Sequence, residues 1–248
     1  MSPVVPAPIE RPSPNHDDRP AGVAIDMLVL HYTGMPSAAA ALARLCDPAA
    51  KVSAHYLVDE DGAVYALVGE HRRAWHAGVS SWRGRRDING RSIGVEIVNP
   101  GHEFGYRPFP EAQMAAVEAL GRAIVARQPI PPRHVLGHSD VAPGRRQDPG
   151  ELFDWARLAA AGVGLWPTAK VARGEMGLTV GPGDGGAPVA EIQRALADFG
   201  YGVPTDGAYD AATGAVVAAF QRHFRPRQID GIVDPETAQR VFQVLASA

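Results

Sequence analysis

The sequence predicts an α/β domain followed by a small domain of three helices. Short apolar runs typical of buried strands alternate with helical patterns over roughly the first 160 residues. A stretch rich in glycine and proline follows, at residues 162–187, and beyond it the pattern is purely helical. A change of pattern across a glycine- and proline-rich stretch indicates a boundary between two structural units.

Each element of the first domain follows from a local pattern. The continuous apolar run at 27–30 predicts a buried strand, and the Ala/Leu-rich run at 38–46 predicts a helix. Glu60-Asp61-Gly62 separates two short apolar runs, at 53–58 and 63–68, which predicts a hairpin. The remaining predictions are strands at 93–98 and 134–137, helices at 110–126 and 153–161, and a long polar loop at 70–91.

Three helices are predicted after the boundary, at 189–199, 210–224 and 234–245, because apolar residues recur there at i, i+3 and i+4. The pattern Asp-Gly-x-x-Asp-x-x-Thr occurs twice, at 206–213 and 230–237. In each copy Asp-Gly predicts a turn and the second Asp predicts a helix N-cap.

Composition excludes several classes of function. The chain has 248 residues and carries 24 Lys+Arg against 27 Asp+Glu, a net charge of −3, which argues against a protein that coats nucleic acid or an anionic membrane. No apolar run approaches the ~18–20 residues that a transmembrane helix needs. Cys46 is the single cysteine, so the chain cannot form an intramolecular disulfide.

Prolines recur in the first 20 residues and interrupt any apolar stretch, which predicts an extended arm over 1–20 and no secretory signal. The expected location is therefore the cytoplasm. The alternative is the periplasm, should a leader precede this sequence.

Four residues carry the candidate chemistry. His31 ends one predicted strand, His138 ends another, and Asp148 lies in a polar loop. Two imidazoles and one carboxylate leave a fourth position for water, which is the ligand pattern of a catalytic zinc. Glu96 interrupts an apolar strand, so its carboxylate must face a polar cavity or a partner, and it is a candidate general base. From spacing alone, structural histidines remain the alternative.

Three longer segments resemble the zinc-dependent N-acetylmuramoyl-L-alanine amidases of the AmpD and AmiD type. They are Leu-Val-Leu-His-Tyr-Thr at 28–33, Ser-Ile-Gly-Val-Glu-Ile-Val-Asn at 92–99 and the segment from Val135 to Gly150; shorter matches lie at 12–15, 53–56 and 75–82. The resemblance runs from about residue 11 to about residue 161. It implies a mixed central β-sheet flanked by helices, with a zinc site in a surface groove.

The resemblance also assigns roles. It implies that His31, His138 and Asp148 bind Zn²⁺ and that Glu96 serves the attacking water. The family's oxyanion-stabilising lysine, two residues before the ligand aspartate, is Arg146 here, and Arg145 is the alternative.

Further residues of the matched segments are candidates for lining the substrate groove. For Trp82, ordinary packing within the loop is the alternative. His223 is expected at the surface or behind the site. The candidate groove residues are Tyr56, His76, Trp82 and Asn99.

A second resemblance covers about 187–245, where the repeated motif resembles the three-helix peptidoglycan-binding domain of cell-wall hydrolases. A helical bundle without that role is the alternative. The predicted organisation is an arm at 1–20, a catalytic domain at 21–162, a linker at 163–186 and the three-helix domain at 187–248. We expect the catalytic domain to fold without the helices.

Together the resemblances imply a zinc-dependent hydrolase that cuts the amide bond between N-acetylmuramic acid, in its 1,6-anhydro form, and L-alanine. The alternative is a non-catalytic peptidoglycan-recognition module on the same fold. The presence of His31, His138, Asp148 and Glu96 favours the enzyme, because a pure binder does not need this set. The expected partner is peptidoglycan or a muropeptide.

Overall fold

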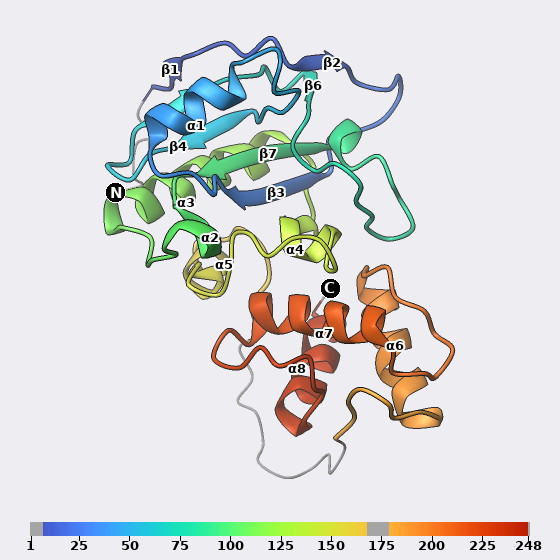
Figure 1. Ribbon diagram of the computed structural model, residues 1–248. Helices are drawn as coiled ribbons and strands as arrows, with labels where there is room; N and C mark the ends of the chain where they lie inside the picture. Colours follow the sequence, from blue (N-terminus) through green and yellow to red (C-terminus); the bar gives the residue numbers. More distant parts are fainter. Residues whose placement is uncertain (1–6, 168–178, 248) are drawn as a thin grey trace.

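The computed structural model describes residues 7–167, which we call the N-terminal part, and residues 179–247, the C-terminal part. The N-terminal part contains a β-sheet with helices around it, and the C-terminal part is a bundle of three helices that lies below it in Figure 1. The first six residues of the predicted arm and residues 168–178 of the predicted linker lie outside the described residues. The domain boundaries stay predictions.

A six-stranded mixed sheet organises the N-terminal part. Every neighbouring pair is parallel except β4 and β5, which form the predicted hairpin. This confirms the mixed sheet. The strands, in spatial order, are β1 (Ile9–Glu10), β5 (Val64–Ala66), β4 (Tyr56–Val58), β7 (Ser92–Ile97), β3 (Met27–Tyr32) and β8 (Val135–Gly137).

One face of the sheet packs against the long helix α3 (Glu111–Arg127) and the short helix α5 (Trp155–Ala160). Leu28 and Leu30 of β3 point to this face and pack in one core with Ile124 of α3. The residues between them, Met27, Val29 and His31, point to the other face because side chains alternate along a strand. That second face carries the candidate site.

The second face is covered in two portions. Helix α1 (Ala38–Leu45) packs over Leu57 of β4. Met27 and Val29 of β3 instead join the core of the C-terminal part. The site lies on the portion between them, beside two four-residue helices that the sequence did not predict: α2 (Gly101–Phe104) and α4 (His138–Val141).

The N-terminal arm is extended, as expected, but it also forms sheet. Strand β2 (His16–Asp18) pairs antiparallel with β6 (Arg72–Ala74), which lies inside the predicted polar loop. Arg19 at the end of the arm then donates to the backbone carbonyls of Glu70, Asn89 and Ser92. The arm therefore holds the two ends of the 70–91 loop, including the 3-10 turn η1 (Asn89–Arg91), against the sheet.

The C-terminal part contains the three predicted helices: α6 (Ala187–Phe199), α7 (Ala211–Phe224) and α8 (Pro235–Ala246). The repeated motif performs the capping predicted for it. Asp210 accepts from Thr213 N at 2.8 Å, and Asp234 accepts from Thr237 N at 2.9 Å. Within the described ranges, no helix has the length and apolar character needed to cross a membrane.

The two parts share a hydrophobic core rather than meeting at a polar surface. Met27, Val29 and Leu136 of the sheet lie in one cluster with Phe199 of α6 and Phe220 of α7. The residues on both sides of 168–178 are packed as well, since Val163 and Val180 are both buried. This packing differs from the expectation of two units joined only by a linker.

Candidate functional site

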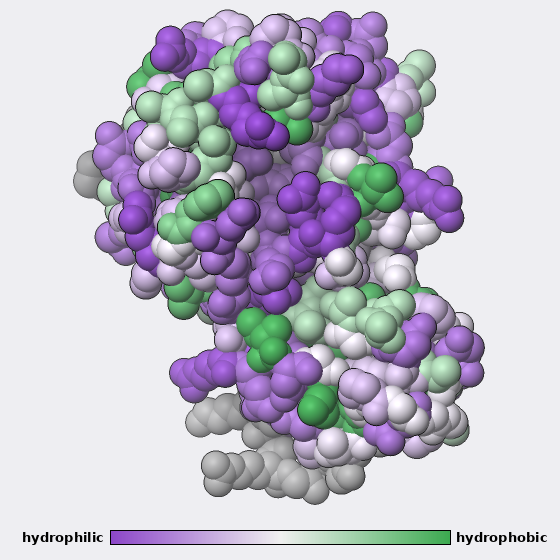
Figure 2. All heavy atoms as spheres, viewed as in Figure 1, coloured by the Kyte–Doolittle hydropathy of each residue, from purple (hydrophilic) through white to green (hydrophobic). Residues whose placement is uncertain are grey.

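A groove of about 560 Å³ opens on the second face of the sheet, and the four residues that carry the candidate chemistry all line it. Figure 2 shows a hollow with hydrophilic walls on this face of the N-terminal part. The groove lies where β3, β7 and β8 end. The carboxyl ends of parallel strands are where α/β sheets commonly bind ligands.

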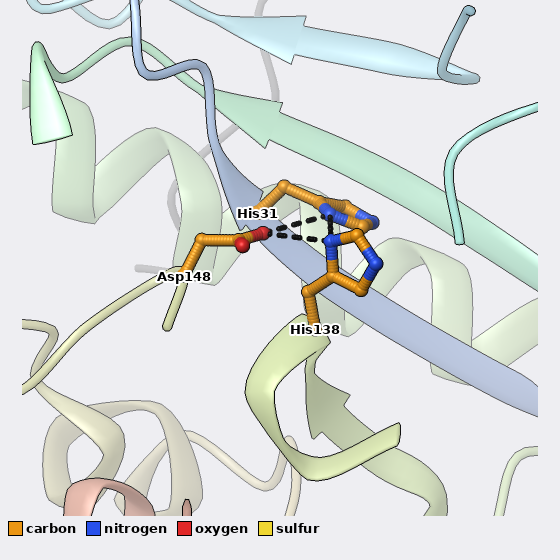
Figure 3. A group of neighbouring side chains, drawn as sticks. All are labelled: His31, His138 and Asp148. Atoms are coloured by element: carbon orange, nitrogen blue, oxygen red, sulfur yellow. Dashed lines mark hydrogen bonds and ion pairs between the residues drawn. The ribbon is translucent and has the colours of Figure 1, made fainter. Parts of the chain in front are cut away.

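His31, His138 and Asp148 converge in this groove from three segments (Figure 3): His31 from β3, His138 from the start of α4, and Asp148 from the loop before α5. His31 Nδ1 lies 3.0 Å from His138 Nδ1, and Asp148 Oδ2 lies 3.0 Å and 3.1 Å from these two nitrogens. All three residues are buried. Three ligand-type atoms facing one point from different segments form a site that can hold a metal ion.

Backbone packing brings the last two candidate ligands, His138 and Asp148, together. His138 is the first residue of α4, directly after β8, so the sheet fixes its position. The amide N–H of Ser139 donates to the carbonyl of Asp148 at 2.9 Å. This bond joins the two ends of the intervening loop, although the loop itself is polar and largely exposed.

The outer ring nitrogens of both histidines are hydrogen-bonded, which leaves Nδ1 free to ligate. His138 Nε2 lies 3.0 Å from the carbonyl of Ala77 and donates to it. His31 Nε2 lies 3.0 Å from His76 Nδ1, and His76 Nε2 lies 3.1 Å from Ser92 Oγ. A second-shell bond of this kind fixes the tautomer of a metal-binding histidine.

The chain from Ser92 to His31 has one consistent direction. The Ser92 hydroxyl donates to the carbonyl of Ile88 at 2.7 Å, so its oxygen accepts from His76 Nε2–H. His76 Nδ1 must then accept from His31 Nε2–H. The lone pair of His31 Nδ1 consequently faces the ligand cluster. We call this the Ser92–His76–His31 relay.

Gly94 makes room for the relay. A Cβ at this position of β7 would lie 2.5 Å from the ring of His76. Any other residue would push the ring away from His31. The glycine in the matched segment Ser-Ile-Gly-Val-Glu therefore serves the close approach of an imidazole to the strand.

Burial and the neighbouring charges set the protonation states. Burial, and after it the charge of His138, lowers the pKa of His31 to about 4. Burial alone would raise the pKa of Asp148, but the two histidines outweigh it and hold that pKa well below its ordinary value. The cluster therefore keeps a neutral imidazole beside an ionised carboxylate, which is the state that binds a metal ion.

Glu96 lies in the same groove, with its Oε2 buried and without a hydrogen-bond partner among the described residues. Burial and the negative charge of Asp148 raise its pKa well above the ordinary value, and Arg146 opposes this. A carboxylate with a raised pKa and a free oxygen facing a groove is suited to accept a proton.

The two arginines that follow α4 differ in their contacts. Arg145 donates to the carbonyls of Ala77 and Val79, at 2.8 Å and 2.7 Å, so its guanidinium holds the loop over His138. Arg146 also lines the groove, and its guanidinium makes no hydrogen bond or ion pair with the residues that the structure describes. Arg146 is therefore the cation that is free to meet a ligand.

The structure corrects three of the four candidate groove residues. The hydroxyl of Tyr56 donates to Glu70 outside the groove, and the Asn99 side chain is fully buried between Arg107 O and Gly101 N. Trp82 is 0% exposed and packs between the two parts of the chain. His76 does line the groove, but its two ring nitrogens are committed to the relay.

The sequence analysis assigned no specific role to two residues that support the site, Ser92 and His223. Ser92 starts a strand and gives no local signal of its role. His223, expected at the surface or behind the site, is buried 2.7 Å from Asp140 across the contact between the two parts. Only the tertiary structure brings these residues to the site.

Comparison with known families gives two matches. A model described as N-acetylmuramoyl-L-alanine amidase matches residues 21–151, and a model described as a peptidoglycan binding domain matches residues 185–241. Among curated proteins, N-acetylmuramoyl-L-alanine amidase AmiD of Escherichia coli is 38% identical over 230 residues, which cover 86% of this chain and 79% of AmiD. The 1,6-anhydro-N-acetylmuramyl-L-alanine amidase AmpD of Citrobacter freundii is 35% identical over 166 residues, which cover 60% of this chain and 87% of AmpD.

Solved structures agree over almost the whole chain. AmpDh3 from Pseudomonas aeruginosa superposes with a TM-score of 0.79 at 33% identity, covering 92% of this chain and 94% of AmpDh3. AmiD from Escherichia coli, in complex with the substrate anhydro-N-acetylmuramic acid-L-Ala-D-gamma-Glu-L-Lys, gives a TM-score of 0.77 at 36% identity, covering 92% and 93%. The superposition therefore includes the sheet, the groove and the helical bundle.

Proposed function

Because this chain belongs to the N-acetylmuramoyl-L-alanine amidase family, and is an amidase that hydrolyses the bond between N-acetylmuramic acid and L-alanine, we propose that zinc is its metal and that His31, His138 and Asp148 are the ligands. The single observation that carries the proposal is the convergence of these three ligand atoms in the groove. Catalysis, rather than recognition alone, is the function that the family relatives support.

The donor set fits zinc. Two imidazole nitrogens and one carboxylate oxygen, with both outer nitrogens hydrogen-bonded, match the three-ligand pattern that leaves a fourth position open. When bound, zinc would polarise the scissile carbonyl and make a nearby water acidic enough to attack at neutral pH.

The chain's own residues supply the remaining steps. Glu96 accepts a proton from the attacking water and delivers it to the amide nitrogen as L-alanine leaves. Arg146 stabilises the negative charge that develops on the carbonyl oxygen. Arg145 keeps the 77–79 loop in place over His138, so that His138 and the groove wall stay fixed during the reaction.

We propose 1,6-anhydro-muropeptides as the preferred substrate. Both an AmiD structure and an AmpDh3 structure hold an anhydromuramic peptide, and the AmpD relatives are named for the same sugar. The C-terminal part, which matches a peptidoglycan binding domain, would add affinity for polymeric wall. A cytoplasmic enzyme would meet soluble anhydro-muropeptides, and an exported one would meet whole sacculi.

Two measurements test the function. We expect the purified protein to contain one zinc per chain and to release free stem peptide from an anhydro-N-acetylmuramyl peptide, identified by mass. Parallel digestion of sacculi measures the substrate preference. A protein that binds the muropeptide but releases no peptide, with zinc fully loaded, would instead be a recognition module.

A further inference from the structure

The C-terminal part covers the same face of the sheet that carries the metal site, directly beside that site. Figure 1 shows α7 lying against α4, the short helix that begins at His138. The shared core continues from Val141 of α4 to Phe220 of α7. A peptidoglycan-binding unit that served only as a tether would not need to bury a portion of the catalytic sheet.

A tight contact at Trp82 anchors the two parts. Its ring packs edge-on against Phe199 and Tyr201, with centroid distances of 5.6 Å and 5.0 Å. Gly200 lies so close that a Cβ there would be 2.4 Å from the indole. The amide of Arg83 donates to the carbonyl of Gly200 at 2.8 Å, which joins the two backbones beside this contact.

A buried carboxylate lies at the centre of the contact. Asp140 is 1% exposed and accepts three hydrogen bonds. One comes from the amide of Gly137 at 2.7 Å. The other two come from the C-terminal part: the hydroxyl of Tyr201 at 2.6 Å and Nδ1–H of His223 at 2.7 Å. A buried carboxylate needs such donors, and two of its three belong to the helical bundle.

Asp140 in turn holds the helix that carries a metal ligand. It is the third residue of α4, and its bond to Gly137 N closes the turn around His138. The same helix is tied to the third ligand, because Ser139 N donates to Asp148 O. The position of His138 relative to Asp148 therefore depends on how firmly Asp140 is held.

The aromatic surroundings add a second connection. The ring of His223 stacks on Trp155 at 3.8 Å between centroids, with an interplanar angle of 20°. A Cβ at Gly137 would lie 3.3 Å from that same indole and 2.8 Å from Pro149, the residue after Asp148. His223, Trp155 and the backbone on both sides of the ligands are thus packed in one continuous layer.

We propose that the C-terminal part is a structural support of the metal site, and that Tyr201 and His223 are positioning residues that act on His138 through Asp140. This inference rests on the zinc site of the proposed function. In this proposal the helical bundle is an integral part of the catalytic unit and is not a detachable wall-binding unit.

The test compares zinc affinity in matched variants of the full-length chain. Tyr201→Phe removes one donor to Asp140, and Tyr201→Phe/His223→Leu removes both while keeping the buried volume. Tyr209→Phe is the control, because the hydroxyl of Tyr209 is also buried and donates at 2.6 Å, but to Gly231 within the bundle. The rescue variant is Tyr201→Phe/His223→Asn, in which Asn replaces the Leu of the double variant and restores a donor near the position of Nδ1.

We expect the double variant to bind Zn²⁺ about 10–100-fold more weakly in a chelator competition, the range typical for loss of outer-shell support. The absorption spectrum of the Co²⁺-loaded double variant should differ from that of the wild type, because the ligand geometry is altered. On an anhydro-muropeptide, kcat should fall while KM stays near the wild-type value. Tyr209→Phe should leave all three readouts unchanged. Tyr201→Phe/His223→Asn should recover most of the zinc affinity that Tyr201→Phe/His223→Leu loses.

Zinc affinity and Co²⁺ spectrum equal to wild type in the double variant would overturn the inference, since the bundle would then be docked without supporting the site. Should the double variant fail to fold, the single Tyr201→Phe decides: a zinc affinity no weaker than that of Tyr209→Phe also overturns it. Failure of the proposed function is a different result, because then the wild-type chain itself would bind no zinc or release no peptide.

Discussion

His31 of β3 and Glu96 of β7 are register partners on adjacent parallel strands, so the proposed metal ligand and the candidate base stand side by side on one face of the sheet. Parallel strands place paired residues on the same face and end at the same edge. This relationship explains how residues 65 positions apart in the sequence reach one groove. It also makes the role of Glu96 testable independently of the metal.

Glu96→Gln should keep zinc and the fold but lose most of the rate. The substitution preserves size and removes basicity, and general-base contributions are typically ~10²–10⁴-fold in kcat. Steady-state kinetics on an anhydro-muropeptide and a zinc determination check this. Glu111→Gln is the control, because Glu111 pairs with Arg157 on the far side of the sheet from the groove. A Glu96→Gln enzyme within a few-fold of wild type would make Glu96 a structural carboxylate.

Exhaustive chelation should abolish activity, and added zinc should restore it, because the attacking water is acidic enough only beside a metal ion. His31→Ala, His138→Ala and Asp148→Ala should each lower both zinc content and rate. His71→Ala, at an exposed histidine, is the control. Full turnover by a protein shown to be free of metal would exclude the zinc mechanism.

Local patterns predicted the strands and helices that have a regular apolar periodicity. The central strands β3 and β7 and the helices α3, α6, α7 and α8 all occur within a few residues of the expected positions. Helix α4 was missed because four residues are too few to show a period. Strands β2 and β6 were missed because they are polar and are held by exposed ion pairs such as Asp17–Arg73.

The residues of the candidate site also divide into those that a sequence pattern identifies and those that only tertiary contacts identify. The resemblance pointed to residues that carry chemistry, and the structure brings His31, His138, Asp148 and Glu96 into one groove. Trp82 was a candidate for the groove because it lies in a segment that resembles the amidases, with ordinary loop packing as the alternative. Its actual partners, Phe199 and Tyr201, lie more than 100 residues away in the sequence, and no local pattern encodes that contact.

Arg146→Ala should lower kcat by about 10²-fold, the usual cost of removing one donor to a developing oxyanion. Arg146→Lys should retain most of the rate, because the family's own residue at this position is a compact cation. Arg145→Ala should behave differently: it frees the carbonyls of Ala77 and Val79 and should lower thermal stability and zinc affinity along with the rate. Equal kinetics for Arg146→Ala and wild type would move the oxyanion role to Arg145.

Stability should fall in acid because of His55. Burial, and after it the charge of Arg19, lowers the pKa of His55 from 6.5 to about 4 in the folded chain. At pH values between about 4 and 6.5, the unfolded chain binds a proton at His55 that the folded chain does not bind. The free energy of unfolding therefore decreases as the pH falls from about 6.5 towards 4. The loss can reach about 3 kcal/mol for one such histidine.

Thermal unfolding as a function of pH measures this effect, and His55→Gln should flatten the slope over that interval. His55 is not a metal ligand: its Nδ1 accepts from Gly94 N at 2.9 Å. The slope should therefore persist in zinc-loaded protein. An unchanged slope in His55→Gln would assign the acid sensitivity to other groups.

The Ser92–His76–His31 relay should set zinc affinity from behind the ligand. His76→Phe removes the acceptor of His31 Nε2–H, leaves the other tautomer of His31 free to form, and should weaken Zn²⁺ binding about 10–100-fold. Ser92→Ala leaves His76 in place but removes the acceptor of its Nε2–H, so a smaller loss is expected. Ser13→Ala is the matched control, because the Ser13 hydroxyl is also buried but donates to Leu45 O and takes no part in the relay. Chelator competition ranks the variants, and the order His76→Phe, Ser92→Ala, Ser13→Ala from weakest to tightest binding follows from the direction of the relay.

A loss confined to KM, with zinc affinity intact in His76→Phe, would instead mean that His76 contacts substrate and that His31 keeps its tautomer without help.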